Sequence, residues 1–331
     1  MAVPTAPTAG PAGNTSRKAG LLRRAVPRGA PPRGTARRRT DLTPYAFLLP
    51  GFALFCLIVA YPLGRALQIS FYDWAVVPTQ VSQFVGFDNY VRGLQDGHFW
   101  LSLANVGVYL VVTVPGQIVI GMFLAVLLDA RLPARGLFRV LFYIPVVTSW
   151  VVVALLFKYL FTTDGGAVNW LLHDVLGLVD HNVPWLQERW TGLLAVCVLG
   201  VWKGVGWAMV IFLAALTGVS SELKDAAAID GANAWQRFMN VSLPAIRRTL
   251  LFVIVMLIIG GFNVFISILL MTDGGPAGST EVPLTYMYKQ AFEFLDFGYA
   301  SALSFLLAVA IAVVSFVQFH LFRDDGTGAP R

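Results

Sequence analysis

Six apolar segments, each about 20 residues or longer, dominate the sequence. They cover approximately residues 45–67, 101–128, 137–160, 192–216, 249–272 and 299–322. A helix of roughly 20 apolar residues crosses the hydrocarbon core of a bilayer, which is about 30 Å thick. A helix also satisfies its own backbone hydrogen bonds in lipid, and these segments lack the alternation of a membrane barrel. The sequence therefore predicts an all-α, polytopic membrane protein with six transmembrane helices.

The composition argues against a soluble enzyme and against a nucleic-acid-binding protein. Hydrophobic residues make up 57% of the chain and charged residues only 13%, whereas roughly a quarter of the residues in a soluble domain are charged. The net charge of +6 has a local origin, because nine of the 24 Lys and Arg residues lie between Arg17 and Arg39. The excess positive charge therefore belongs to a tail and not to a binding surface.

The chain divides into a tail, a membrane domain and a short C-terminal end. Residues 1–40 are rich in Pro, Gly, Ala, Thr and Arg, so they are expected to form a disordered basic tail that can contact anionic membrane lipid. Arg37–Arg39 before an apolar segment is also the pattern of a twin-arginine export signal, but five more apolar segments follow. Residues 41–325 are expected to form one six-helix domain that contains a polar loop at 218–248, and residues 326–331 a tail.

The distribution of basic residues predicts the orientation in the membrane. The N-terminal tail, the turn after the second segment, residues 218–248 and the C-terminal tail hold most of the Lys and Arg residues. The three intervening loops hold three basic residues against eleven acidic ones. Because cytoplasmic loops retain positive charge, both termini should lie in the cytoplasm and the chain in the cell membrane.

The loop between the fourth and fifth segments has the clearest local pattern. Ser221 is expected to cap a helix with Glu222 in its first turn, and the alanines that follow favour helix. Gly231 can end this helix because glycine tolerates a left-handed turn, and a second short helix should reach Pro244. On these grounds alone, the segment is either a linker helix or a cytoplasmic helix-turn-helix that presents small residues to a partner.

This loop resembles the EAA loop of binding-protein-dependent ABC importer permeases. Residues 225–232 read DAAAIDGA, and Leu243–Pro244 follow at the distance usual in that family. Residues 47–71, 85–105 and 271–300 resemble the carbohydrate subgroup, which includes the maltose, lactose and glycerol-phosphate permeases, and specifically its first-subunit type. Asp225 stands where the family usually has glutamate, so the charge is kept while the side chain is shorter by one methylene.

The resemblance implies a type I ABC importer transmembrane fold and a set of coupling residues. The loop would insert as a coupling helix into a cytoplasmic ATPase subunit, with Gly231 forming the turn and Phe238 and Leu243 holding the loop against the membrane helices. The residues that the resemblance assigns to this role are Asp225, Ala226, Ala227, Asp230, Gly231, Ala232, Phe238, Leu243 and Pro244.

The resemblance also implies partners that supply the energy. These are a second permease subunit forming a heterodimer, two copies of an ATPase subunit and an extracytoplasmic solute-binding protein. The chain itself has no Gly-x-x-x-x-Gly-Lys-Ser/Thr phosphate loop. It is therefore expected to bind no cofactor and to be no enzyme, with ATP and magnesium bound by the ATPase partner.

Four residues within the apolar segments are candidates for the substrate path. Lys203 lies in the fourth segment, where a charge costs about 2.5–3.5 kcal/mol, so it either faces a cavity or partner or snorkels to the membrane surface. Asn263, beside Phe262, offers the donors and the acceptor that a sugar requires. Trp207 can stack against a sugar ring or simply pack between helices.

The predicted function is transport of a sugar, such as a di- or oligosaccharide, as the permease subunit of an ATP-driven importer. Two alternatives remain. One is a permease of the same superfamily for a glycerol phosphate or polyol. The other is an ATP-independent transporter or channel, which would need intramembrane carboxylates for ion coupling, and the six segments contain none. The four histidines show no metal-ligand spacing.

Overall fold

The computed structural model describes residues 43–77, 79, 81–130 and 133–323, and it separates into two units, residues 1–55 and 56–331. The first unit contributes helix α1 (Thr43–Phe55), which has Pro50 in its interior. All other elements belong to the second unit. The predicted tails, residues 1–40 and 326–331, lie outside the described residues.

The described residues contain four uninterrupted helical stretches that are long and apolar enough to cross a membrane. They are Phe47–Ile69, α4 (Gly97–Asp129), α8 (Arg189–Thr217) and the apolar part of α15 (Phe297–Arg323). The first of these stretches runs from α1 through η1 (Cys56–Ala60) into α2 (Tyr61–Ile69). If two bent helix pairs are each counted as one span, the number rises to six. The predicted all-α multi-pass fold is confirmed.

The third predicted segment is not one helix. It consists of α5 (Arg135–Val147) and α6 (Trp150–Leu160), which meet at an angle of 93°. Pro145 lies in the last turn of α5, where it lacks the backbone N–H that would continue the hydrogen-bond ladder. Thr148 then adopts an extended conformation and ends the helix. Pro115, by contrast, lies inside α4 without interrupting it.

The fifth predicted segment is also broken. Helix α12 (Arg247–Gly261) ends at the pair Gly260–Gly261, and the chain resumes as α13 (Ile266–Met271) after a short turn. At its other end, α12 meets the preceding helical segment Ala234–Ala245 at 71°. That segment comprises α10 (Ala234–Arg237), η3 (Phe238–Ser242) and α11 (Leu243–Ala245).

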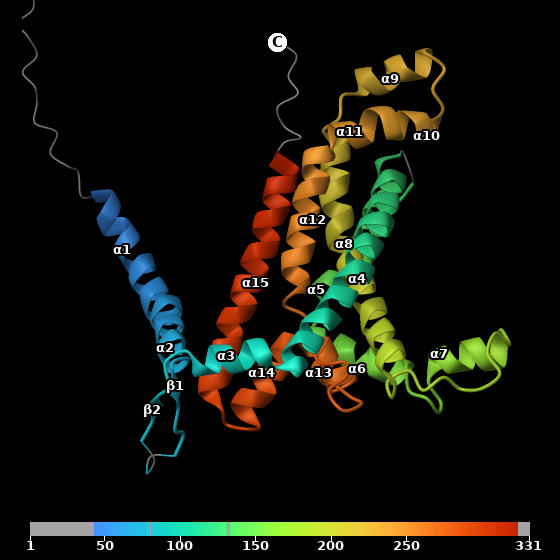
Figure 1. Ribbon diagram of the computed structural model, residues 1–331. Coiled ribbons are helices and arrows are strands. Elements are labelled where there is room, and N and C mark those ends of the chain that lie inside the picture. Colours follow the sequence, from blue (N-terminus) through green and yellow to red (C-terminus); the bar gives the residue numbers. More distant parts are fainter. Residues whose placement is uncertain (1–42, 78, 80, 131–132, 324–331) are drawn as a thin grey trace, which may run out of the picture. The chain divides into compact units, whose positions relative to one another are not determined.

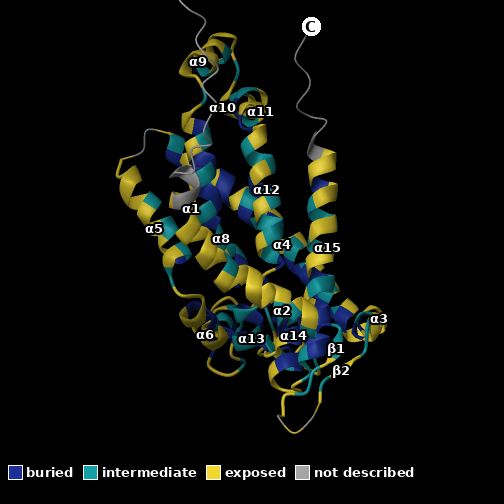
Figure 2. Ribbon diagram, turned by 90° about the vertical axis from the view of Figure 1, so that its left-hand side faces the viewer, coloured by how far each residue is buried: buried dark blue, intermediate teal, exposed yellow. Residues whose placement is uncertain are grey.

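Within the second unit, α4 and α8 pack against each other along their length, and both helices carry many buried residues. Figure 2 colours the buried residues of the protein dark blue. Small residues allow the close approach: a Cβ atom on Gly121 of α4 would lie only 2.9 Å from the Cβ of Ala208 of α8. Two clusters of buried apolar side chains result, one around Phe99 and Leu199 and the other around Met209 and Phe212.

The two ends of this unit carry different elements (Figure 1). The segment between α8 and α12, with α9 (Ser221–Ile229), α10 and α11, lies at one end. We call it the coupling segment, after the role that the resemblance implies. The opposite end carries a short antiparallel hairpin, β1 (Tyr72–Asp73) and β2 (Gln83–Phe84), and helices α3 (Asp88–Gln95) and α14 (Pro283–Phe292). It also carries α7 (Ala167–Asn169) and η2 (Trp170–Val175).

Candidate functional site

A cavity of about 500 Å³ lies between α4, α8 and the break that follows α12. Its wall combines aromatic, polar and glycine positions from these helices and from the start of α6. The lining residues are Tyr109, Thr113, Gln117, Trp150, Gly200, Gly204, Trp207, Met256, Leu257, Gly260, Gly261, Asn263, Val264, Phe265, Ile266 and Ser267. We call this space the central cavity.

Gln117 contributes a side-chain amide to the wall of the central cavity. Its Nε2 donates a hydrogen bond to the carbonyl of Gly200 at 3.1 Å, and only 7% of the residue is exposed. Its Oε1 is buried and has no hydrogen-bond partner among the described residues. Gly204 makes room for this amide, since a Cβ atom there would lie 2.3 Å from Oε1. A buried acceptor without a partner is costly, so a hydrogen-bond donor is missing beside this oxygen.

Asn263 lies in the turn after α12, where its Nδ2 donates to the carbonyl of Ile259 at 3.0 Å. It also lines a second hollow of about 570 Å³, which extends over α14 and α15. The central cavity and this second hollow share Asn263, Phe265 and Ile266. Asn263 and Trp207, two of the predicted substrate-path residues, therefore border the central cavity, whereas Phe262 is buried and does not line it.

Lys203 is buried and holds the break between α5 and α6. Its Nζ donates to the carbonyl oxygens of Pro145 at 2.8 Å and Thr148 at 2.7 Å, and it lies 4.7 Å from the centre of the Trp150 ring. With 3% of its surface exposed, Lys203 does not snorkel, so the structure excludes that one of the two alternatives. It does not line the central cavity, but it contacts Trp150, which does.

Sequence reasoning missed several residues that border the central cavity: Tyr109, Thr113, Gln117 and Trp150. One signal was present, because Gln117 is a polar residue within the second apolar segment, immediately after Pro115 and Gly116. Polar side chains inside membrane segments usually face the protein interior or a cavity.

The coupling segment begins at a cap one residue earlier than expected. Ser220, and not Ser221, is the N-cap of α9, with its Oγ accepting from the backbone N–H of Glu222 at 3.2 Å. The helix ends at Gly231, whose φ of +82° lies in the left-handed region. The N–H of Ala232 then donates to the carbonyl of Ala227 at 3.0 Å, which closes the helix end.

A capping box between Asn233 and Gln236, not recognised in the sequence, starts α10. Phe238, together with Leu243, packs against the buried cluster around Phe212. Asp225 and Asp230 are exposed, and so are two large apolar side chains, Ile229 at 87% and Trp235 at 66%. The assigned coupling residues thus divide into a part that faces the helix bundle and a part that is open to a partner.

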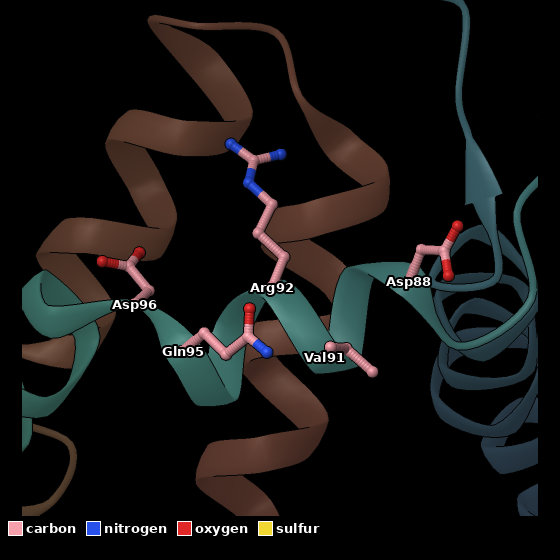
Figure 3. A pocket seen from close by; sticks show the side chains of 5 residues that line it. All are labelled: Asp88, Val91, Arg92, Gln95 and Asp96. Atoms are coloured by element: carbon pink, nitrogen blue, oxygen red, sulfur yellow. The ribbon is translucent and has the colours of Figure 1, made fainter.

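The opposite end of the unit contains a compact polar network. The Asp96 carboxylate, which also caps α4, accepts hydrogen bonds from the hydroxyls of Tyr286 and Tyr299, each at 2.5 Å. Burial raises the pKa of Asp96, but these hydrogen bonds outweigh that effect and hold the pKa below its ordinary value. Arg92 pairs with Asp296 at 2.7 Å, and Figure 3 shows Arg92 and Asp96 extending on the same side of α3.

A second polar group anchors the loop between α13 and α14. Asn105 of α4 donates to the carbonyls of Ser279 and Glu281, and Lys289 pairs with the Glu281 carboxylate at 2.9 Å. Burial lowers the pKa of Lys289, but the hydrogen bond and the charge of Glu281 dominate and raise it above its ordinary value. This loop is therefore fixed to both α4 and α14.

Comparisons with known proteins identify the family. The profile described as "Binding-protein-dependent transport system inner membrane component" matches residues 117–324. A lactose transport system permease protein of Rhizobium radiobacter is 32% identical, over 88% of this chain and 98% of that protein. An arabinooligosaccharides transport system permease protein of Halalkalibacterium halodurans is 33% identical, over 85% of this chain and 87% of that protein.

A solved structure shows the same fold. A chain of a bacterial ABC transporter involved in the import of the acidic polysaccharide alginate superposes with a TM-score of 0.75, at 24% identity, over 87% of this chain and 97% of that one. The predicted type I importer fold is thus confirmed. The chain belongs to the family of binding-protein-dependent transport system inner membrane components and is a multi-pass permease of an ABC transporter.

Proposed function

We propose that this permease translocates a neutral oligosaccharide through the central cavity. The observation that carries the proposal is the unpartnered Oε1 of Gln117, a residue that lines the central cavity together with Trp150 and Trp207. A sugar presents hydroxyl donors at its edges and apolar C–H groups on its ring faces, so a cavity wall with an amide and aromatic rings suits it. The names of the lactose and arabinooligosaccharide permeases support the same substrate class.

The charge and size of the site narrow the substrate further. Among the described residues that line the central cavity, none is charged, which favours a neutral saccharide over a glycerol phosphate. The adjoining hollow, which shares the lining residues Asn263, Phe265 and Ile266 with the cavity, adds space beside it. A site of this extent suits a di- or oligosaccharide better than a single sugar or a small polyol.

The coupling segment is proposed to lie in the cytoplasm and to insert into one of two ATPase subunits, which bind ATP and magnesium. The exposed acids Asp225 and Asp230 and the exposed apolar side chains of Ile229 and Trp235 give this segment a surface fitted to a protein partner. Both chain termini would then be cytoplasmic. A second permease subunit would complete the translocation path, and an extracytoplasmic binding protein would deliver the saccharide at the end that carries α3 and α14.

The proposal is tested with the complete importer, co-purified from its own membranes and reconstituted into proteoliposomes. We expect ATP-dependent uptake of a labelled neutral oligosaccharide, and competition by unlabelled oligosaccharides but not by glycerol phosphodiesters. The variant Gln117→Leu should reduce uptake while the complex still assembles. ATP-dependent uptake of a glycerol phosphodiester would refute the substrate class, and uptake by this chain alone without ATP would refute the importer.

A further inference from the structure

One lysine joins the coupling segment to the ends of two membrane helices. The Nζ of Lys224 in α9 lies 2.9 Å from Oδ2 of Asp129, the last residue of α4. The same Nζ lies 3.4 Å from the carbonyl oxygen of Leu216, in the last turn of α8. We call Lys224, Asp129 and the Leu216 carbonyl the Lys224 clasp.

The environment of the Lys224 clasp strengthens the interaction beyond that of an ordinary surface pair. The Lys224 and Asp129 side chains are 28% and 25% exposed, so both are partly shielded from solvent. The ammonium also lies at the C-terminal ends of α4 and α8, where the helix dipole is negative. Phe238 and Ser242 border the same small hollow of about 140 Å³ as Lys224 and Asp129.

The clasp holds the same two helices that form much of the central cavity. From Asp129, α4 leads back to Gln117 and Tyr109, and from Leu216, α8 leads back to Trp207 and Gly204. Helices α4 and α8 pack closely against each other, so a shift of one helix is transmitted to the other. By contrast, α9 is linked to α8 along the chain only through residues 218–220, a short connection that contains a glycine.

We propose that Lys224 and Asp129 are positioning residues that transmit movement of α9 to the α4–α8 pair and so to the central cavity. Their role differs from that of the residues after Lys224 in the loop, which are proposed to face the ATPase. When α9 is displaced, the Lys224 ammonium shifts the C-terminal ends of α4 and α8, and the cavity-lining residues of these two helices move with them. The inference rests on the proposed function, since it concerns how ATP hydrolysis at a partner is coupled to saccharide uptake.

The test measures saccharide molecules transported per ATP hydrolysed by the reconstituted complete importer. For Lys224→Met and Asp129→Asn, we expect this ratio to fall by at least about fivefold, the lower end of the coupling usual between linked sites. Lys224→Arg, which keeps a positive charge between Asp129 and the Leu216 carbonyl, should retain most of the ratio. Arg135→Gln, which removes an exposed charge from the start of α5 and outside the coupling segment, is the matched control and should transport like the native protein.

Each outcome separates the clasp from the proposed function. If the native complex shows no ATP-dependent uptake, the proposed function fails. If it transports normally and Lys224→Met and Asp129→Asn keep the native ratio, the clasp proposal fails. Should Lys224→Met and Asp129→Asn not assemble, Lys224→Arg decides: it keeps the positive charge between the two helix ends, so native coupling supports the clasp and lost coupling overturns it.

Discussion

Replacing Lys203 by methionine tests whether this buried lysine stabilises the helix break beside the central cavity. The substitution keeps an unbranched side chain but removes the ammonium that bonds the carbonyls of Pro145 and Thr148 at 2.8 and 2.7 Å. Hydrogen bonds to a charged group contribute about 1.5–3 kcal/mol each, so two contribute roughly 3–6 kcal/mol. The contact with the Trp150 ring adds about 2 kcal/mol when it is shielded from water.

The gain from removing a buried charge opposes this loss. A lysine within a membrane helix costs about 2.5–3.5 kcal/mol, and methionine avoids that cost. The balance predicts that Lys203→Met lowers the free energy of unfolding by roughly 2–5 kcal/mol. The loosened Trp150 ring should also weaken saccharide binding, which would appear as a higher KM for uptake.

The measurement is thermal or denaturant unfolding of the purified protein in detergent, followed by circular dichroism. Lys158→Met is the matched control, because Lys158 lies on the exposed side of α6 and should tolerate the change. Substitutions at such exposed positions usually alter stability by no more than about 0.5 kcal/mol. If Lys203→Met unfolds like the control, the reasoning about the bonded carbonyls is wrong.

Three further predictions concern other parts of the structure. Gly231→Val should abolish transport without preventing membrane insertion, because a β-branched residue resists φ of +82° although its Cβ would meet no atom within 4 Å. Uptake assays and membrane fractionation check this prediction, and Gly231→Asn is expected to retain activity. Gly204→Ala should raise the KM for the saccharide by displacing the Gln117 amide, and comparable uptake kinetics would contradict it. The pKa of Asp96 is lowered in the folded state, so its stabilising contribution is complete at pH values above its ordinary pKa of 3.8 and is lost as the pH falls through its folded-state pKa. Unfolding measured as a function of pH should show this loss in the native protein and not in Asp96→Asn.

Local patterns were sufficient to predict the features that depend on neighbours in the chain. Apolar segment length gave the membrane helices, and the alanines followed by Gly231 gave a helix with a defined end. The serine cap was displaced by one residue, since Ser220 and Ser221 are adjacent and equally able to cap. Such an error reflects the similar chemistry of two neighbours and leaves the predicted helix unchanged.

Features that depend on distant contacts could not be predicted in the same way. Asp129 and Lys224 are 95 positions apart, and neither stands in a pattern that indicates the other. Pro145 indicates a bend in the third segment, but apolar residues continue on both sides of it, so the sequence did not show that the angle is 93°. For Lys203, the sequence left two alternatives open, and only the position of the α5 carbonyls shows that the ammonium is bonded inside the protein.

The two broken segments explain why the central cavity lies where it does. A helix break leaves backbone carbonyls without their usual partners, and in a membrane they must be bonded within the protein. Lys203 bonds the carbonyls at the end of α5, and Asn263 bonds the carbonyl of Ile259 near the end of α12. Both breaks border the central cavity, through Trp150 on one side and Asn263 on the other. Irregular backbone and polar side chains therefore occur together at the site, because the side chains donate hydrogen bonds to the free carbonyls and the carbonyls accept the buried side-chain donors.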